Sequence, residues 1–289
     1  MRPSGAVKRL YPWDGHRLAV DGGELHYLDE GRGKPVLAVH GNPTWSFYWR
    51  AIVNAFAEDR RVVVPDHIGC GLSDKPQDWD YRLDQHVENL VRLVLHLDLH
   101  DITLVVHDWG GAIGMGMATR LPERIERIVV TNTAAFRSQR IPLSIAGCRI
   151  PVLGDIAVRG FNGFAWAATW RTTERPLADD VKEGLLLPYD TWANRIATHR
   201  FVKDIPMEAS HPSYGTLLGI EKGLERLTDK PMLILWGEQD WCFTPAFRAE
   251  WERRFPDARV QAWEDVGHYV MEDAPERVVH AVRAFTAEA

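Results

Sequence analysis

The chain has 289 residues and a formal net charge of −6, and hydrophobic residues make up 45% and charged residues 26% of it. These values are typical of a soluble globular protein with one large α/β domain. The acidic balance, without a cluster of Lys and Arg, excludes a nucleic-acid-binding protein. The first ten residues lack the apolar core of a signal peptide, and no apolar stretch is long enough to span a bilayer.

The cysteine content agrees with a cytoplasmic location, which we expect for this chain. Cys70, Cys148 and Cys242 are three residues at unrelated spacings. Such a set is neither a disulfide framework nor a metal site. Free buried thiols in a reducing compartment are the expected state.

The first part of the chain predicts a mostly parallel sheet covered by helices, because strand-like and helix-like runs alternate. Residues 17–20 and 24–29 are expected to form an antiparallel pair, joined by the tight-turn sequence Asp21-Gly22-Gly23. Residues 35–39 are a continuous apolar run, which is typical of a buried parallel strand. A helix over 44–57 and a strand over 61–64 follow.

The next predicted helix lies near residues 83–97, where apolar side chains recur at spacings of four and three and therefore share one face. These side chains are Leu83, Val87, Leu90, Val94 and Leu97. The remaining predicted elements, in chain order, are a strand at 102–106, a helix at 110–120, strands at 125–130 and 232–235, a helix after Pro245, a strand at 260–263 and a helix at 275–285.

Between residues 133 and 228 the alternation of strands and helices stops. This segment is rich in aromatic residues, Arg, Pro and Gly, and has helix-like patches without strands. We predict a helical cap here, inserted into a core domain made of residues 1–132 and 229–289. A lid of this kind is expected to determine substrate selectivity.

The sequence around Asp108 has the pattern of a nucleophile elbow. Val106-His107-Asp108-Trp109-Gly110-Gly111 lies between a predicted strand and a predicted helix. A sharp turn of this kind lifts the side chain at its centre into a pocket, and small residues behind it leave room. Ser occupies the centre of the common elbow, but Asp108 occupies it here. The alternative is that Asp108 only caps the helix.

Two further residues favour a catalytic Asp108. His268 follows the last predicted strand, and Asp240 follows the strand before it. Nucleophile, acid and base therefore come in the chain order that the α/β-hydrolase fold requires. Asp240 would orient the imidazole and stabilise its cation. Glu238 lies earlier in the same turn, and Asn132, after the strand before the cap, cannot serve as an acid.

A carboxylate nucleophile suits displacement at saturated carbon. It would form a covalent ester with the substrate, and His268 would activate a water molecule against that ester. The sequence His40-Gly41-Asn42-Pro43 follows the first parallel strand, where this fold supplies part of an oxyanion hole. The backbone and side-chain N–H groups of Asn42 and Trp109 are expected to hold a departing halide or an oxygen. His40 and His107 are expected to be structural.

The chain contains 12 tryptophans. They could pack a large core or line an apolar pocket. Besides Trp109, we expect three of them to line the substrate pocket from the cap: Trp166, Trp170 and Trp192.

Together these motifs resemble the haloalkane dehalogenase family over nearly the whole chain. The resemblance rests on residues 40–46, 107–111, 237–240 and 267–268. It implies an α/β-hydrolase fold with a mostly parallel sheet of eight strands flanked by helices, and an inserted helical cap. It also implies that Asp108 is the nucleophile, His268 the base and Asp240 the acid, with Asn42 and Trp109 as the halide-stabilising pair. No metal or organic cofactor is implied.

The acid after the later strand, combined with the Asn–Trp pair, resembles the third subfamily. That subfamily also contains the β-lactone decarboxylases of bacterial long-chain olefin biosynthesis, which residues 66–76 and 188–196 resemble in particular. The resemblance implies a small apolar substrate and a homo-oligomer or a multi-enzyme assembly. Two activities therefore stay open: dehalogenation of an alkyl halide, and conversion of a cis-disubstituted β-lactone to a cis-alkene and carbon dioxide.

Two other functions are weighed against these. An epoxide hydrolase would need cap tyrosines to protonate the epoxide oxygen, and Tyr189 and Tyr214 are the candidates, although an apolar residue would then be expected in place of Asn42. A non-catalytic binding module on the same fold has no need for nucleophile, base and acid together. Arg171 and Arg195 in the cap could contact a carboxylate-like group, but are expected to face solvent or pair with acids.

Overall fold

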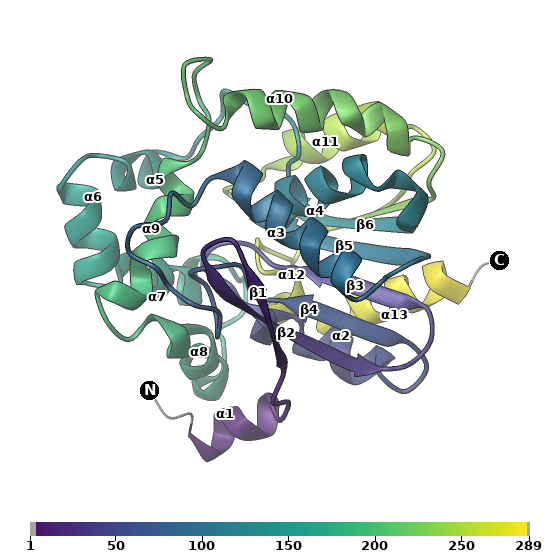
Figure 1. Cartoon of the computed structure of the whole chain (residues 1–289), viewed down its shortest axis with the longest axis horizontal. Helices are drawn as coiled ribbons and strands as arrows, with labels where there is room; N and C mark the ends of the chain where they lie inside the picture. Colours follow the sequence, from purple (N-terminus) through teal and green to yellow (C-terminus); the bar gives the residue numbers. More distant parts are fainter. Residues whose placement is uncertain (1–3, 288–289) are drawn as a thin grey trace.

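Eight strands form one sheet in the order β1-β2-β4-β3-β5-β6-β7-β8 in the computed structural model, which describes residues 4–287 (Figure 1). β2 pairs antiparallel with β1 and β4, and the other neighbours are parallel. The strands are β1 His16–Val20, β2 Gly23–Gly31, β3 Pro35–Val39, β4 Arg61–Pro65, β5 Ile102–Asp108, β6 Ile125–Thr133, β7 Met232–Gly237 and β8 Arg259–Trp263. The predicted mostly parallel sheet of eight strands is confirmed.

Side chains of the central strands alternate between two hydrophobic cores, one on each face of the sheet. In β3, Leu37 and Val39 belong to one core, whereas Val36 and Ala38 belong to the other. This is the consequence of a two-residue side-chain period in a strand that is covered on both faces. It explains why residues 35–39 read as an unbroken apolar run.

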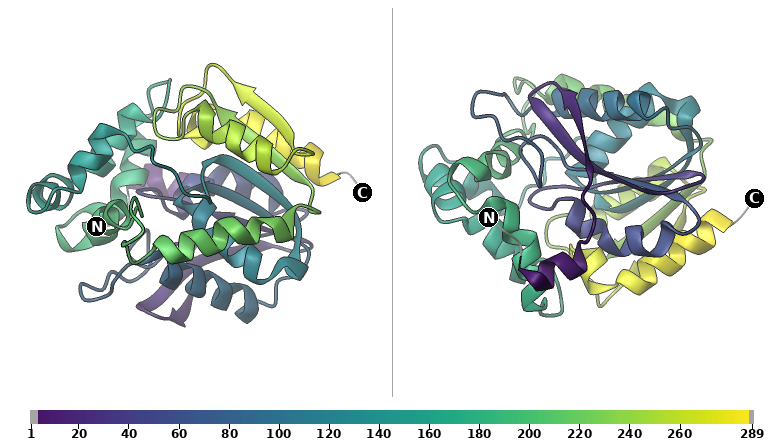
Figure 2. Two further views of the ribbon diagram at one scale, coloured as in Figure 1. Left: turned by 90° about the horizontal axis from the view of Figure 1, so that it is seen from above. Right: turned by 60° about the horizontal axis from the view of Figure 1, so that its bottom comes forward.

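One face of the sheet is covered by α3 Leu83–His96, α4 Trp109–Arg120 and α11 Pro245–Arg254, whose apolar residues pack into the first core. The other face is covered by η1 Ser46–Trp49, α2 Arg50–Phe56, α12 Val270–Asp273 and α13 Pro275–Ala287, which pack into the second core. The short helix η2 Pro122–Arg124 precedes β6, and α1 Gly5–Leu10 packs against the cap helix α8 Asp179–Leu186. Figure 2 shows these helix layers from two further sides.

In the described chain, helices and loops connect β6 to β7. Besides α8, these helices are α5 Leu143–Cys148, α6 Leu153–Asp155, η3 Ile156–Gly160, α7 Gly163–Arg171, η4 Leu187–Tyr189, η5 Ala193–Arg195, α9 Ile196–Lys203, α10 Tyr214–Gly223 and η6 Leu224–Leu227. Most of them lie together beyond one end of the sheet, at the left of Figure 1.

Helix α10 does not lie with the other helices of this segment. It packs against α3 and α4, where Leu217 and Ile220 enter the first core. The segment predicted as the cap, residues 133–228, therefore includes a helix that packs on the core, and its boundaries stay a prediction.

No helix within residues 4–287 combines the length and the apolar composition needed to cross a membrane.

Candidate active site

Asp108 stands at the point where β5 ends and α4 begins. Its backbone has φ +50° and ψ −128°, a conformation that non-glycine residues rarely adopt and that is common where strain serves a functional site. A β-carbon added at Gly110 would lie 2.1 Å from the carbonyl oxygen of Val39. The turn therefore needs a residue without a side chain two positions after Asp108, as the sequence pattern predicted.

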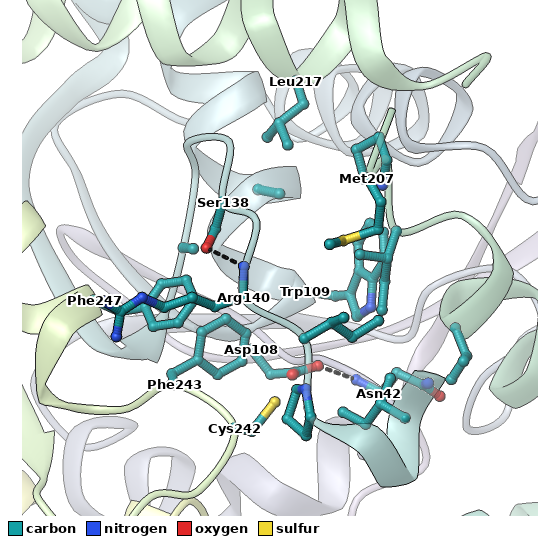
Figure 3. Close-up of a pocket in the computed structure, with 18 of the residues that line it drawn as sticks. Asn42, Asp108, Trp109, Ser138, Arg140, Met207, Leu217, Cys242, Phe243 and Phe247 are labelled. Carbon is teal, nitrogen blue, oxygen red and sulfur yellow. Dashed lines mark hydrogen bonds between the residues drawn. The ribbon is translucent and has the colours of Figure 1, made fainter. Parts of the chain in front are cut away.

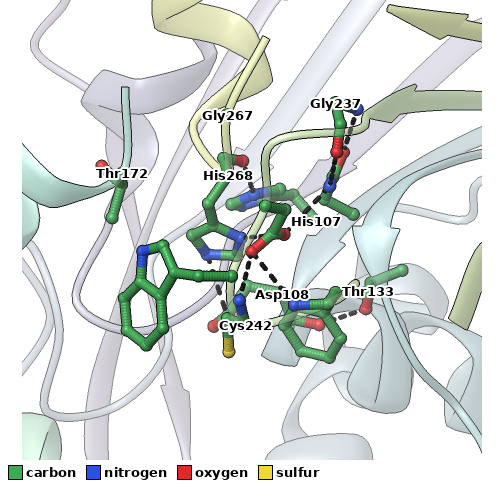
Figure 4. A network of polar contacts seen from close by, with 12 residues as sticks. His107, Asp108, Thr133, Thr172, Gly237, Cys242, Gly267 and His268 are labelled. Atoms are coloured by element: carbon green, nitrogen blue, oxygen red, sulfur yellow. Dashed lines mark hydrogen bonds and ion pairs between the residues drawn. The ribbon is translucent and has the colours of Figure 1, made fainter. Parts of the chain in front are cut away.

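Three side chains near the ends of three strands lie side by side at this turn: Asp108, His268 and Asp240. His268 Nδ1 lies 2.7 Å from Asp240 Oδ2, and His268 Nε2 lies 3.7 Å from Asp108 Oδ2. All three residues are buried. Figure 4 shows His268 beside Asp108 within this polar network. The imidazole thus has one nitrogen on the Asp240 carboxylate and the other facing the carboxylate of the elbow.

Asp240 is held by more than the histidine. Its Oδ1 accepts hydrogen bonds from the backbone N–H groups of Cys242 (2.6 Å) and Phe243 (3.0 Å), and its Oδ2 accepts one from Asn132 Nδ2 (2.9 Å). The same Asn132 side chain bonds both backbone groups of Gly237. Asn132 therefore orients the acid from the neighbouring strand. Glu238, the other carboxylate of the turn, pairs with Arg248 at 2.6 Å.

Burial and nearby charges set the protonation of the pair. Burial lowers the pKa of His268, but the charge of Asp240, the hydrogen bond to it and the charge of Asp108 raise that pKa more, so it lies above its ordinary value. Burial raises the pKa of Asp108, while His268 and the backbone N–H groups of Asn42 and Trp109 oppose the rise. The pKa of Asp108 therefore lies above its ordinary value, because burial outweighs these opposing contributions.

Asn42 and Trp109, the predicted halide-stabilising pair, line the same cavity as Asp108. The Asn42 backbone N–H donates to Asp108 Oδ1 at 2.7 Å, and the Trp109 indole lines the same cavity as the Asp108 carboxylate. The Asn42 side-chain amide donates to the carbonyl of Thr198 in the cap helix α9 at 3.0 Å. Asn42 thus reaches from the core to the cap across the site.

Two buried histidines support the site without facing it. His107 Nε2 lies 2.9 Å from the backbone carbonyl of His268, and the His40 ring lies 2.7 Å from the carbonyl of Gly41. The His107 contact ties the elbow strand to the loop that carries His268. Neither histidine lines a cavity at Asp108, and their structural role stays a prediction.

Two cavities meet at Asp108. The first, of about 130 Å³, extends along Trp109 to Met207 and to Leu217 of α10 (Figure 3). The second, of about 300 Å³, extends along His268 to the helix α7 and to Trp241. Both are lined mainly by apolar and aromatic side chains. Cavities of this kind suit an apolar ligand, with the few polar groups gathered at the reacting centre.

The prediction that Trp166, Trp170 and Trp192 line the pocket is wrong. They line neither cavity, and their side chains are 58%, 55% and 47% exposed. Trp166 and Trp170 are four residues apart in α7, so they share the outer face of that helix, where their rings make an edge contact at 5.8 Å.

The aromatic lining comes from other positions. It consists of Trp109, Phe136, Phe164, Trp241, Phe243, Phe247 and Tyr269. Only the place of Trp109 in the elbow motif signalled one of these residues from sequence. The others lie in loops and helices whose facing directions depend on tertiary packing.

The cap tyrosines that an epoxide hydrolase would need are elsewhere. Tyr189 is fully buried and its hydroxyl donates to the carbonyl of Thr44 at 3.4 Å, and the Tyr214 hydroxyl accepts from Arg137 at 2.9 Å. Neither tyrosine lines the cavities at Asp108. The structure therefore contradicts the epoxide hydrolase alternative as far as it rests on these two residues.

Three further expectations are corrected or refined by the structure. Cys70 is buried as expected, but Cys148 and Cys242 are only partly buried, and both line the second cavity. Arg195 donates to four backbone carbonyls rather than to acids. Arg171 lines the second cavity and lies 4.8 Å from the Trp241 ring.

The segments 66–76 and 188–196 lie next to one another outside both cavities. They line a separate hollow together with residues of the N-terminal region, through Gly71, Lys75, Pro188 and Asp190. None of their residues lines the cavities at Asp108. The residues that carry the resemblance to the lactone enzymes are therefore not among those that line the cavities at Asp108.

Comparisons with known proteins agree with this geometry. A family model described as the alpha/beta hydrolase fold matches residues 34–275. A cis-3-alkyl-4-alkyloxetan-2-one decarboxylase of Shewanella oneidensis is 44% identical over 96% of this chain and 90% of its own. Haloalkane dehalogenase 2 of Mycobacterium bovis is 32% identical over 95% of each chain. The crystal structure of haloalkane dehalogenase DbeA from Bradyrhizobium elkani matches with a TM-score of 0.86 and 27% identity, over 94% of this chain and 97% of its own.

Proposed function

Because the chain belongs to the α/β-hydrolase fold family, in the group that contains haloalkane dehalogenases and oxetanone decarboxylases, we propose that Asp108 displaces a leaving group from a saturated carbon of an apolar substrate. The observation that carries the proposal is the Asp108–His268–Asp240 line at the junction of two apolar cavities. Carboxylate attack at saturated carbon gives a covalent ester, which is the chemistry for which a carboxylate suits the elbow better than a hydroxyl does.

In the dehalogenase form of this reaction, the substrate is an alkyl halide. A carboxylate oxygen of Asp108 forms the bond to carbon while the carbon–halogen bond breaks, and the N–H groups of Asn42 and Trp109 stabilise the departing halide. His268 then takes a proton from a water molecule that attacks the ester carbonyl, and Asp240 stabilises the imidazolium. An alcohol leaves and the Asp108 carboxylate is restored.

The second candidate substrate is a cis-disubstituted β-lactone, and the 44% identity to the oxetanone decarboxylase favours it. Asp108 forms a bond to ring carbon C4 while the bond between C4 and the ring oxygen breaks, which leaves a carboxylate on C3. The bond between C3 and this carboxylate then breaks, its electron pair forms the C3–C4 double bond, and the bond from C4 to Asp108 breaks. Carbon dioxide and a cis-alkene leave, as a step of olefin biosynthesis would require, and no water is consumed.

The deciding experiment offers both substrates to the same enzyme. Purified protein is incubated with a cis-3,4-dialkyl β-lactone and, separately, with 1-bromo- and 1-iodoalkanes, and alkene, alcohol and free halide are measured. We expect turnover of at least one class and a loss of roughly 10⁴-fold or more for Asp108→Ala, because the nucleophile is removed. Asp257→Ala, at an exposed position, is the matched control. Equal activity of the two variants would overturn the proposal.

We further propose that copies of this chain associate through the cap. This proposal is supported by apolar side chains that are exposed on α5 to α7 and on the loops between these helices. We call this set the apolar cap face, and it consists of Leu143, Val152, Leu153, Phe161, Trp166 and Trp170. Leu143 is 91% and Phe161 is 80% exposed. Monomeric soluble proteins rarely expose so many large apolar side chains in one short segment. Other enzymes of the same reaction sequence are the alternative occupants.

A cytoplasmic location stays part of the proposal, and the three free cysteines agree with it.

A further inference from the structure

The two cavities meet at Asp108, and most of the residues that line one of them do not line the other. Five residues line both of them: Asn42, Asp108, Ile145, Phe164 and Cys242. We call the first cavity the α10 arm and the second the α7 arm, after the helices that they reach. The nucleophile therefore stands at a fork and not at the closed end of a single tunnel.

The α10 arm is built from the core and the cap together. Met207 lies in the loop between α9 and α10, Leu217 lies on α10, and Phe247 lies on α11. Figure 3 draws Leu217 and Asp108 toward opposite ends of this arm. Its polar residues, Ser138 and Arg140, come from the loop that follows β6.

The α7 arm is built mainly from the cap. Cys148 of α5, Val158 of η3 and Ala167 of α7 line it on the cap side, and Trp241 and Tyr269 line it on the core side. Besides Asp108 and His268, the charged residue that lines this arm is Arg171, which is exposed at the end of α7. Both arms thus offer apolar walls between Asp108 and an exposed arginine.

A forked apolar site fits one geometry of substrate. A molecule that reacts at a terminal carbon has one chain and would leave the other arm filled with water against apolar walls, which is unfavourable. A molecule that reacts at an internal carbon has two chains that diverge from the reacting centre. Resting on the proposed function of Asp108, we infer that the site selects substrates whose reacting carbon lies between two apolar chains, with one chain in each arm.

The inference applies to both candidate substrates, the β-lactone and the alkyl halide. A cis-3,4-dialkyl β-lactone carries its chains on adjacent ring carbons, and a secondary alkyl bromide carries them on the carbon that bears the halogen. The arms therefore set which carbon Asp108 attacks, while Asn42 and Trp109 receive what leaves. Each arm then limits the length of one chain independently of the other.

The test closes one arm at a time. Met207→Trp adds bulk to the α10 arm, and Ala167→Phe adds bulk to the α7 arm, and both positions are half-buried, so the larger side chain has room to adjust. Ala209→Trp, an exposed position next to the α10-arm loop, is the control for added bulk. Two lactone series are used, in which either the C3 chain or the C4 chain is lengthened while the other is held short.

The expected result is a crossed pattern. One variant lowers kcat/KM about tenfold or more for long C3 chains only, and the other does so for long C4 chains only, while Ala209→Trp matches the parent. Loss for the same series in both variants, or for neither, overturns the inference. The same crossing is measured as dissociation constants in an Asp108→Ala background, from the change in tryptophan fluorescence on lactone binding. A crossed binding pattern without any turnover in the parent enzyme would sink the proposed chemistry and keep the two-arm site.

Discussion

The edge of the sheet and the cap contribute to the same site by different physical means. At the sheet edge, Asp108, His268 and Asp240 each follow a parallel strand, and the strands bring their carboxyl ends together whatever the side chains are. In the cap, short helices meet the cavity at angles that only their mutual packing determines. Positions in the sequence therefore translate into positions in space far more directly at the sheet edge than in the cap.

The polar contacts follow the same division. Asp240 accepts three hydrogen bonds besides the one to His268, all from core residues. Hydrogen bonds between the site and the cap run from Asn42, Trp241 and Tyr269 to backbone carbonyls of the cap, and none of them reaches Asp240. The core thus fixes the reacting groups, and the cap contributes mainly apolar walls. Substitutions in the core are expected to change the chemistry, and substitutions in the cap are expected to change selection or association.

Among substitutions that test the difference between the core and the cap, the largest effect on turnover is expected from His268→Ala. With an alkyl bromide, the ester on Asp108 still forms but its hydrolysis loses its base, so turnover falls by roughly 10⁴-fold or more and an alkyl adduct accumulates. Intact-mass spectrometry detects the adduct as a mass increase equal to the alkyl group minus one hydrogen. The exposed His280 supplies the control, His280→Ala.

The same variant separates the two candidate substrates. The lactone route described above consumes no water, so it is expected to survive in His268→Ala within about tenfold. Alkene formation lost together with halide hydrolysis would show that the lactone route needs the base. Absence of any adduct from a bromide that the parent enzyme turns over would show that Asp108 is not the nucleophile.

The next effect in size is expected from Asp240→Asn, and it is read as a pH profile. The base works when it is unprotonated, so hydrolysis declines as the pH falls through the pKa of His268, which is raised above its ordinary value of 6.5. The amide removes the charge that raises this pKa, so the acid limb is expected to move to lower pH. The rate above the limb falls by about 10²- to 10⁴-fold, because the imidazole loses its orientation.

Glu238→Gln is the matched change in the same turn. Glu238 pairs with Arg248 and not with His268, so the acid limb of this variant is expected to coincide with that of the parent. A shift of the limb in Glu238→Gln, or an unmoved limb in Asp240→Asn, would reassign the acid of the site.

The core could be predicted from sequence because its signals are local. Residues 35–39 form β3 as predicted, and the strand predicted at 102–106 extends by two residues so that Asp108 ends it. The helix predicted at 44–57 divides into η1 and α2 at Trp49, whose φ of −89° and ψ of 7° leave the helical range. The six-residue α1 was missed, since one turn and a half carries too little apolar periodicity to be recognised.

The cap could not be predicted in the same way. A helical pattern fixes which residues share a face, as Trp166 and Trp170 do, but it does not say whether that face turns toward the cavity or toward solvent. The aromatic content alone suggested that the face with Trp166 and Trp170 lines the cavity, but in the structure this face is exposed to solvent. The residues of α7 that line the cavity lie on its other face: Gly163, Phe164, Ala167, Ala168 and Arg171.

The smallest effect on catalysis is expected from these outer tryptophans. Trp166→Ser combined with Trp170→Ser should leave kcat/KM within about twofold, because neither ring lines a cavity, and should reduce self-association, because both rings belong to the apolar cap face. Light scattering coupled to gel filtration measures the second quantity. Trp241→Ser is the contrast, since Trp241 lines the α7 arm and its indole donates to the carbonyl of Arg171 at 2.8 Å. Its kcat/KM is expected to fall roughly tenfold with association unchanged. If the double variant lost activity and kept its assembly, the outer face of α7 would contact the substrate and would not be an association surface. The proposed separation of roles between the core and the cap surface would then be wrong for this helix.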